Sequence, residues 1–138
     1  MNNLYARAVF FVKNGERALT FYTEQLGFSV DWKYEADGRP YVFQVSLFGF
    51  ELILNQVDDW TQTRTGHGRV FIGLDEDQVE PLRHHIAAKG IEARRFNWGR
   101  STLVIRDLDA NELFFWLPAG DWSDSKLPML EPGSLVNP

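Results

Sequence analysis

The order of the predicted elements indicates an α+β fold built from two tandem βαβββ modules. Strand-like and helix-like patterns follow one another in the same order twice, on either side of a polar segment. Two landmarks also recur at nearly constant spacing. The opening strands start at Arg7 and Arg69, 62 residues apart, and the helices end at Gly27 and Gly90, 63 residues apart. Such a repeat is typical of an internal duplication.

The first module is predicted over about residues 5–56. Residues 7–12 are β-branched and aromatic, as expected for a strand. A helix is predicted to begin at Asn14, a good N-cap, and to end at Gly27, which suits the left-handed position after a helix. The other strands are predicted at residues 28–33, 41–48 and 50–55, with a turn at 36–40.

A polar linker containing two glycines is predicted over residues 57–68, and the second module over 69–117. Asp77 and Glu80 form a capping-box pattern that predicts the start of its helix, with Pro81 in the first turn, where proline is tolerated. Strands are predicted at residues 69–74, 91–96, 100–106 and 112–117.

The last segment, residues 118–138, holds four of the six prolines and lacks periodicity, so an extended tail is expected there. At 138 residues the chain is long enough for an ordinary hydrophobic core. One domain over residues 1–138 is therefore predicted.

Composition excludes several classes of function. The net charge of −5 argues against a nucleic-acid partner, which needs a basic surface, and against an acidic membrane surface. The apolar run near the first residue is too short for a signal sequence or a membrane span, so a cytoplasmic protein is expected. The absence of cysteine excludes disulfides, thiolate metal sites and cysteine nucleophiles. No serine lies in a G-x-S-x-G setting, and no phosphate-binding glycine motif is present.

Two segments resemble a known superfamily. The stretch from Val12 to Phe28, with Phe-Tyr near the helix end followed by Leu-Gly-Phe, resembles the first helix of the vicinal-oxygen-chelate superfamily. That superfamily includes glyoxalase I, extradiol dioxygenases, fosfomycin-resistance enzymes and bleomycin-resistance proteins. The segment from Asn97 to Trp116 resembles the W-G-R…RDP-x-GN segment of bleomycin-resistance proteins, with Leu108 for the usual proline and Ala110 for the usual glycine.

The resemblance covers about residues 6–117 and implies an architecture. Each module would form a curved mixed sheet, and the modules would pair into a cup with the helices on the outside. It also implies frequent dimers with two cavities, so a homodimer is expected.

The resemblance further implies four positions where enzymes of the superfamily hold a divalent metal. In this chain they carry over to Arg7, Glu51, Arg69 and Phe114. Only Glu51 can be a ligand, because a guanidinium has no lone pair to offer and would repel a cation. No metal and no cofactor are therefore expected. The alternative is a metal-dependent lyase, isomerase or dioxygenase that uses Glu51 with His67 or Glu112, which lie two residues from the implied positions.

Without a metal, the cup is expected to be an aromatic ligand pocket with a few charges. Flat rings and cationic groups bind well to such surfaces. The function favoured is stoichiometric capture of an aromatic or cationic small molecule, such as a glycopeptide antibiotic. The predicted ligand-binding residues are Arg7, Phe11, Glu51, Asn55, Arg69, Phe71, Trp98, Arg100, Phe114 and Trp116.

The same residues are also compatible with structural roles. Phe71, Phe114 and Trp116 are equally compatible with the core. Glu51 could form a structural ion pair with Arg7 or Arg69, or could act as a base in an enzyme without a metal. The neighbouring histidines of the second helix, at positions 84 and 85, are expected to face solvent.

Overall fold

The computed structural model describes residues 5–59, 61–97 and 101–118 of the chain. Two predicted site residues, Trp98 and Arg100, lie outside the described residues, as does the predicted tail from residue 119 onward.

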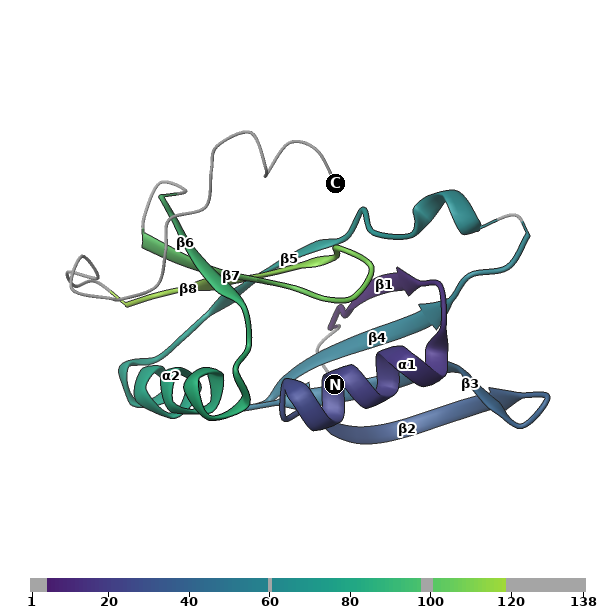
Figure 1. Ribbon diagram of the computed structural model, residues 1–138, viewed down its shortest axis with the longest axis horizontal. Helices are drawn as coiled ribbons and strands as arrows, with labels where there is room; N and C mark the ends of the chain where they lie inside the picture. Colours follow the sequence, from purple (N-terminus) through teal and green to yellow (C-terminus); the bar gives the residue numbers. More distant parts are fainter. Residues whose placement is uncertain (1–4, 60, 98–100, 119–138) are drawn as a thin grey trace.

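The described residues confirm the α+β class and the tandem βαβββ order (Figure 1). Module one forms a four-stranded mixed sheet, here called sheet one, with the strand order β1-β4-β3-β2. Its strands are β1 (Ala8–Val12), β2 (Ser29–Ala36), β3 (Arg39–Leu47) and β4 (Phe50–Gln56).

Module two repeats this arrangement in sheet two, with the strand order β5-β8-β7-β6. In both sheets the first and last strands of the module pair in parallel and lie side by side. The strands of sheet two are β5 (Arg69–Gly73), β6 (Ala93–Asn97), β7 (Ser101–Arg106) and β8 (Glu112–Trp116).

Each module carries one main helix between its first two strands. Helix α1 (Gly15–Thr20) begins as predicted, since the side chain of Asn14 accepts a hydrogen bond from the backbone N–H of Arg17. It continues as a single π-helical turn, Phe21–Gln25, before Gly27 adopts a positive φ of 80°. A short 3-10 turn, Gln62–Arg64, lies in the linker.

Helix α2 (Glu76–Lys89) begins earlier than predicted. Its capping box is formed by Asp75 and Gln78, not by Asp77 and Glu80. The backbone N–H of Asp75 donates to the side chain of Gln78 at 2.9 Å. Pro81 therefore lies inside the helix, although in its first half, and Gly90 ends it in the left-handed conformation as expected.

The β2–β3 hairpin is tighter than the predicted five-residue turn. Ala36 and Arg39 still pair across the two strands, so the loop consists of Asp37 and Gly38 alone. Both loop residues have positive φ, 53° and 74°, which is the geometry of the two-residue hairpin turn that Asp-Gly favours.

Strand β2 is one of the two edge strands of sheet one, and all eight of its residues are exposed. Its pairing with β3 is irregular at two places, between Val30 and Trp32 and between Tyr34 and Glu35. Such bulges bend a strand and interrupt its row of backbone hydrogen bonds.

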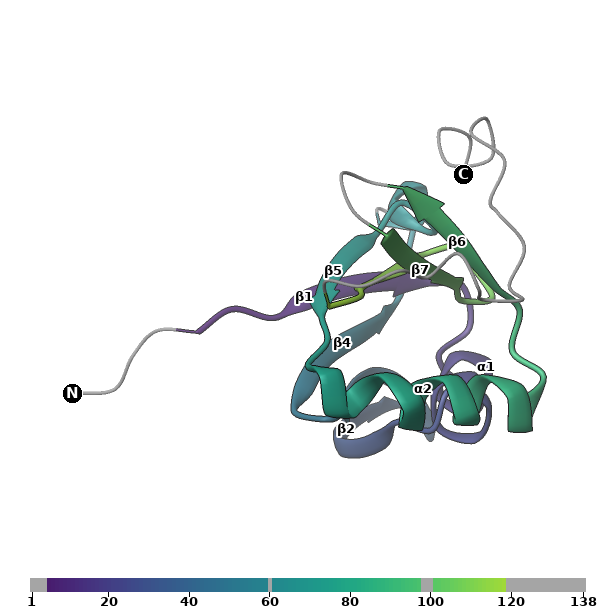
Figure 2. The same ribbon diagram turned by 90° about the vertical axis from the view of Figure 1, so that its left-hand side faces the viewer.

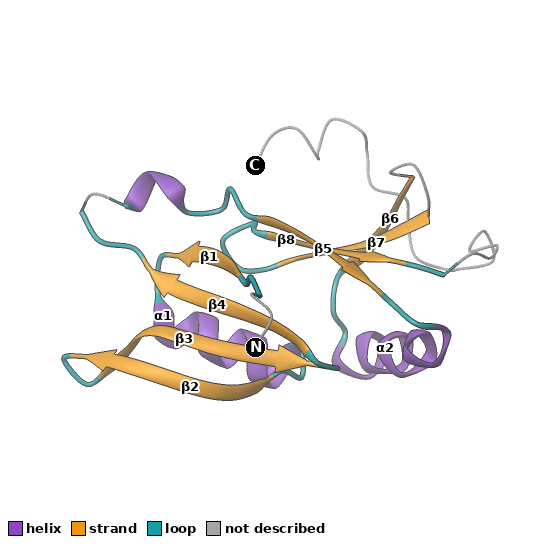
Figure 3. Ribbon diagram, turned by 180° about the vertical axis from the view of Figure 1, so that it is seen from behind, coloured by secondary structure: helices purple, strands orange, loops and turns teal. Residues whose placement is uncertain are grey.

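Each helix packs on one face of its own sheet (Figure 3). In sheet one this face carries the buried side chains of alternate residues on β1, β3 and β4, which pack around Ala18 and Tyr22. In sheet two the equivalent face packs against Leu82 and Ile86 of α2. The opposite face of each sheet is called its open face below.

The two modules share one core and are joined by polar contacts. The hydroxyl of Tyr22 donates to Oδ2 of Asp107 at 2.9 Å, and both groups are buried. The side-chain amide of Asn111 donates to the backbone carbonyl of Phe11 at 3.0 Å. Helices α1 and α2 lie next to one another (Figure 2), and Nε2 of His85 lies 2.9 Å from the carbonyl oxygen of Gln25.

The prediction that His85 faces solvent is therefore wrong, because its half-buried ring contacts module one. Its ring also lies against Gly27, where an added Cβ would come within 2.8 Å of the imidazole.

Among the described residues, no helix is long and apolar enough to cross a membrane.

Candidate functional site

The open face of sheet one holds four of the predicted ligand-binding residues. Direct pairing of Phe11 with Asn55 places both side chains on one face, because residues opposite each other in a sheet point the same way. Val9 pairs with Ile53 in the next row, and Arg7 precedes β1 in the same alternation as Glu51 on β4. The predicted positions of Arg7, Phe11, Glu51 and Asn55 thus lie on one surface.

The same surface carries two exposed aromatic residues that are not among the predicted ligand-binding residues. Trp32 pairs with Gln44 and Tyr34 pairs with Val42, so both rings lie on the open face of sheet one. Trp32 is 43% exposed and Tyr34 is 63% exposed. Their spacing of two residues in a predicted strand was the signal that could have identified them.

Arg7 and Glu51 form an ion pair through one guanidinium nitrogen. Nη2 of Arg7 lies 3.1 Å from both carboxylate oxygens of Glu51. Hydrogen bonds to Tyr5 and then to Glu51 raise the pKa of the Arg7 guanidinium, and its charge lies 4.2 Å from the centre of the Tyr5 ring. The structural ion pair considered for Glu51 is therefore present, with Arg7 as the partner.

A buried amide extends this ion pair into a network. Gln44 donates from Nε2 to Oε2 of Glu51 and to Oδ2 of Asp31, both at 2.8 Å. The other carboxylate oxygen of Asp31 accepts a hydrogen bond from the hydroxyl of Ser46 at 2.9 Å. Two carboxylates and one guanidinium therefore meet on this face, which gives the network a net negative charge.

An equivalent ion pair occupies the open face of sheet two. Arg69 lies directly opposite Glu112 on the neighbouring parallel strand. Nε and Nη2 of Arg69 donate to Oε1 of Glu112 at 2.9 and 2.8 Å. Arg106, opposite Glu112 on the other side, donates from Nε to Oε2 at 3.2 Å. The Glu112 side chain is only 10% exposed, so this carboxylate is more buried than that of Glu51, which is 40% exposed.

The two ion pairs are related by the internal duplication. In each module an arginine, just before β1 or at the start of β5, contacts a glutamate near the start of the parallel last strand. The register therefore makes Glu112 the counterpart of Glu51. Counting along the chain had placed the fourth superfamily position at Phe114, one row further along β8.

These positions do not fit a divalent metal. Two of them carry guanidinium groups, and the carboxylates beside them already bind those guanidiniums. His67, proposed as a third ligand, is exposed. Within the described part of the chain, no three side chains of histidine, aspartate or glutamate gather closely enough to hold an ion.

The three aromatic residues of sheet two differ in exposure. Phe114 is completely buried, and the guanidinium of Arg69 covers its ring at 4.3 Å from the centre. Phe71 is 43% exposed and meets the half-buried ring of Trp116 edge to face at 4.7 Å. Of the predicted aromatic contacts, Phe114 is thus buried and Phe71 is exposed.

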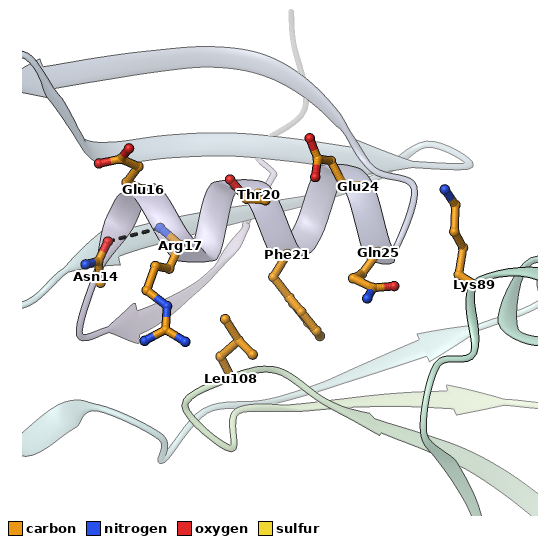
Figure 4. A pocket seen from close by; sticks show the side chains of 9 residues that line it. All are labelled: Asn14, Glu16, Arg17, Thr20, Phe21, Glu24, Gln25, Lys89 and Leu108. Carbon is orange, nitrogen blue, oxygen red and sulfur yellow. Dashed lines mark hydrogen bonds between the residues drawn. The ribbon is translucent and has the colours of Figure 1, made fainter.

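A further hollow lies away from the open faces of the two sheets. It has a volume of about 760 Å³ and runs along α1, on the helix side of sheet one (Figure 4). Phe21 and Leu108 point into it, and Arg17 and Lys89 lie towards its two ends. It is wide open, its glutamates offset its basic residues, and it contains none of the predicted ligand-binding residues.

Comparison with solved structures agrees with this fold. A bleomycin-binding protein from Streptomyces verticillus, solved with copper(II)-bleomycin, is 13% identical, with a TM-score of 0.60 over 86% of this chain and 99% of that one. The antibiotic-binding protein TnmS3 from Streptomyces sp. CB03234 is 19% identical, with a TM-score of 0.58 over 86% and 100%. A lactoylglutathione lyase from Agrobacterium tumefaciens is 15% identical, with a TM-score of 0.58 over 85% and 96%. At these identities the likeness shows the fold alone.

The search of curated proteins found no match. The family model described as Glyoxalase/Bleomycin resistance protein/Dioxygenase superfamily matches residues 5–114, which include both sheets except the end of β8. The duplicated modules and this match together show that the chain belongs to the glyoxalase/bleomycin resistance protein/dioxygenase superfamily.

Proposed function

We propose that this protein binds an aromatic or cationic small molecule on the open faces of its sheets, stoichiometrically and without a metal. The observation that carries the proposal is the pair of arginine–glutamate contacts, Arg7 with Glu51 and Arg69 with Glu112. They take up the positions at which metal-dependent relatives would need free ligands. Because each carboxylate is already paired with a guanidinium, it is not available to coordinate a metal ion that would act as a Lewis acid. The face can then serve as a surface for binding a ligand.

The exposed side chains on these faces support an aromatic ligand. Trp32, Tyr34 and Phe71 are each at least 43% exposed, and they offer flat surfaces on which a ring can stack. The net negative network of Asp31, Glu51 and Arg7 lies beside Trp32 and would attract a cationic group. The bleomycin-binding and antibiotic-binding proteins share the fold, which is compatible with this class of ligand.

A binding experiment with a matched control tests the proposal. The probe is N-phenyl-1-naphthylamine, a neutral aromatic compound whose fluorescence increases when it leaves water. We expect saturable binding at one probe per site, weakened several-fold by Phe71→Ala and unchanged by Leu108→Ala. Leu108 is a suitable control because it is 53% exposed and lies at the hollow along α1, away from the open faces.

Metal analysis completes the test. We expect the purified protein to bind the probe equally well before and after dialysis against a chelator. A stoichiometric divalent metal that is lost in Glu51→Ala would overturn the proposal and favour the metal-dependent alternative with His67 or Glu112. For a cationic ligand, affinity should also fall as salt is added.

A further inference from the structure

A bulge in β2 changes which side chains share the open face of sheet one. Along β2 the pairing passes from Val30 to Trp32 while β3 advances by only one residue, so Asp31 is the extra residue. Consecutive side chains of a regular strand point to opposite faces. At the bulge, the side chain of Asp31 instead reaches Gln44, the residue that pairs with Trp32. An acidic side chain and a large aromatic ring therefore lie next to each other on this face.

Two neutral donors orient the carboxylate of Asp31. Nε2 of Gln44 donates to Oδ2 at 2.8 Å, and the hydroxyl of Ser46 donates to Oδ1 at 2.9 Å. Gln44 is only 4% exposed, and its Nε2 also donates to Oε2 of Glu51 at 2.8 Å. Asp31 itself is exposed, so its carboxylate is oriented by two hydrogen bonds and is still accessible to a solute. A group that is oriented in advance loses less entropy when a ligand binds it.

The charge of Asp31 is not offset within the described residues. Glu51 contacts the guanidinium of Arg7, whereas the hydrogen bonds that Asp31 accepts come from an amide and a hydroxyl. Because Gln44 donates to both carboxylates from one nitrogen, the two acidic groups also lie close together. The negative potential at Asp31 therefore favours a positively charged group, and both of its oxygens retain lone pairs for the donors of that group.

We propose that Asp31 binds a protonated amine of the ligand and that the aromatic ring of the same ligand stacks on Trp32. An ammonium group has three N–H donors, and its hydrogen bonds to a carboxylate are stronger than those between neutral groups. The ring of Trp32 is 43% exposed and adds attraction for a nearby cation. The inference rests on the proposed function and narrows its ligand to compounds that combine an aromatic ring with an alkyl amine.

Three naphthalenes that share a ring and differ in one polar group test the inference. The compound 2-(1-naphthyl)ethylamine carries a protonated amine, 2-(1-naphthyl)ethanol has a hydroxyl in its place, and 1-naphthylacetate has a carboxylate. We expect the unaltered protein to bind the amine about three- to ten-fold more tightly than the alcohol, the scale of a charge-assisted hydrogen bond at an exposed site. The carboxylate should bind most weakly. Isothermal titration calorimetry measures the three affinities, and this comparison requires no substitution.

The variant Asp31→Asn removes the charge and keeps a side chain of similar shape. It should weaken binding of the amine by about three- to ten-fold and leave the alcohol unchanged, which also shows that the variant is folded. Asp37→Asn is the matched control, because it removes the same charge from the loop of the same hairpin. Asparagine tolerates the positive φ of 53° at that position. Trp32→Ala should weaken the amine and the alcohol alike, since both lose the same stacking surface.

Four outcomes would count against the inference. Equal affinity of the unaltered protein for the amine and the alcohol would overturn it and leave the proposed function standing. An equal loss of amine affinity in Asp31→Asn and Asp37→Asn would reveal a general effect of net charge and overturn it as well. Unchanged binding of both probes in Trp32→Ala would place the ring elsewhere, with the same consequence. Binding of none of the naphthalenes would overturn the inference, and the proposed function too if N-phenyl-1-naphthylamine also fails to bind.

Discussion

The hydroxyl of Tyr22 donates a 2.9 Å hydrogen bond to Oδ2 of Asp107, and this contact joins the helical segment of module one to the β7–β8 turn of module two. Asp107 also accepts hydrogen bonds from the backbone N–H groups of Asp109 and Asn111. The carboxylate of Asp107 is therefore hydrogen-bonded within its own turn as well as to Tyr22. A buried side chain of module one thus contacts a buried side chain of module two.

Removal of the Tyr22 hydroxyl should destabilise the protein. In Tyr22→Phe the buried carboxylate of Asp107 loses one donor but keeps those of its own turn, so we expect a loss of about 1–2 kcal/mol in the free energy of unfolding. Urea denaturation measures this. Tyr41→Phe is the control, because the Tyr41 hydroxyl donates to Asp58 at 3.1 Å in a half-buried setting, and its loss should cost only about 0.5 kcal/mol. Equal losses would contradict a special role for Tyr22.

Burial of Asp107 should appear in the pH dependence of stability. Burial is the largest influence and raises the pKa of Asp107 above its ordinary value of 3.8, against hydrogen bonds from Asn111 and Tyr22 that lower it. The folded state therefore holds this proton more tightly than the unfolded state does. Its contribution to stability is fully present at pH values below 3.8, falls as the pH rises from 3.8 through the pKa of the folded state, and is constant above that.

The variant Asp107→Asn isolates this effect. In Asp107→Asn the free energy of unfolding should not show the fall with rising pH that titration of Asp107 causes. The difference in free energy of unfolding between the variant and the unaltered protein should therefore change across the acid range and become constant above it. Denaturation at a series of pH values measures the difference. A difference that stays constant from the most acid pH upward would contradict the raised pKa of Asp107.

The two arginine–glutamate contacts should contribute unequally to stability. In Glu112→Gln two arginines lose the carboxylate between them at a site where the glutamate is only 10% exposed, so we expect a loss of about 1–2 kcal/mol. Both arginines are about one-third exposed, which keeps the loss below that of a fully buried pair. Glu51→Gln, at a 40% exposed carboxylate, should cost less than about 1 kcal/mol. The reverse order in thermal or chemical denaturation would contradict this comparison.

Gly68 should not tolerate a methyl group. A Cβ at this position would lie 2.4 Å from the ring of Phe10 and 2.9 Å from Oδ1 of Asn111, where the modules meet. Because the Phe10 ring is buried, Gly68→Ala should cost about 1–3 kcal/mol through overpacking. Gly73→Ala is the matched control, since nothing lies within 4 Å of its added Cβ. Comparable stability of the two variants in urea would show that Phe10 moves aside without cost.

The element order was predictable because each βαβββ module carries its own local signals. The start of α2 was not, because Asp75 with Gln78 and Asp77 with Glu80 are overlapping patterns of similar local quality. The buried stripe of Val79, Leu82 and Ile86 fits either starting point. Only the observed hydrogen bonds distinguish the two patterns.

For the candidate site, the sequence predicts which residues of a strand share a face, but not how neighbouring strands align. Alternation on β1 and β4 places Arg7 and Glu51 on one face, so their contact could be foreseen. The contribution of Gln44 and Asp31 depends on a bulge in β2, and that of Arg106 depends on the register between β7 and β8. Pairing register is a property of the folded sheet, and for the same reason counting residues along the chain selected Phe114 over Glu112.

The irregular outer strand β2 has a consequence for behaviour at high concentration. A regular exposed strand invites another chain to add to the sheet, and this is a common route to aggregation. The interruptions beside Trp32 and Tyr34 disturb the backbone on which such growth would build. Under the proposed one-to-one binding, the amount of protein must match the amount of ligand. A protected sheet edge would then keep a concentrated protein from aggregating, while the exposed rings of Trp32 and Tyr34 stay accessible.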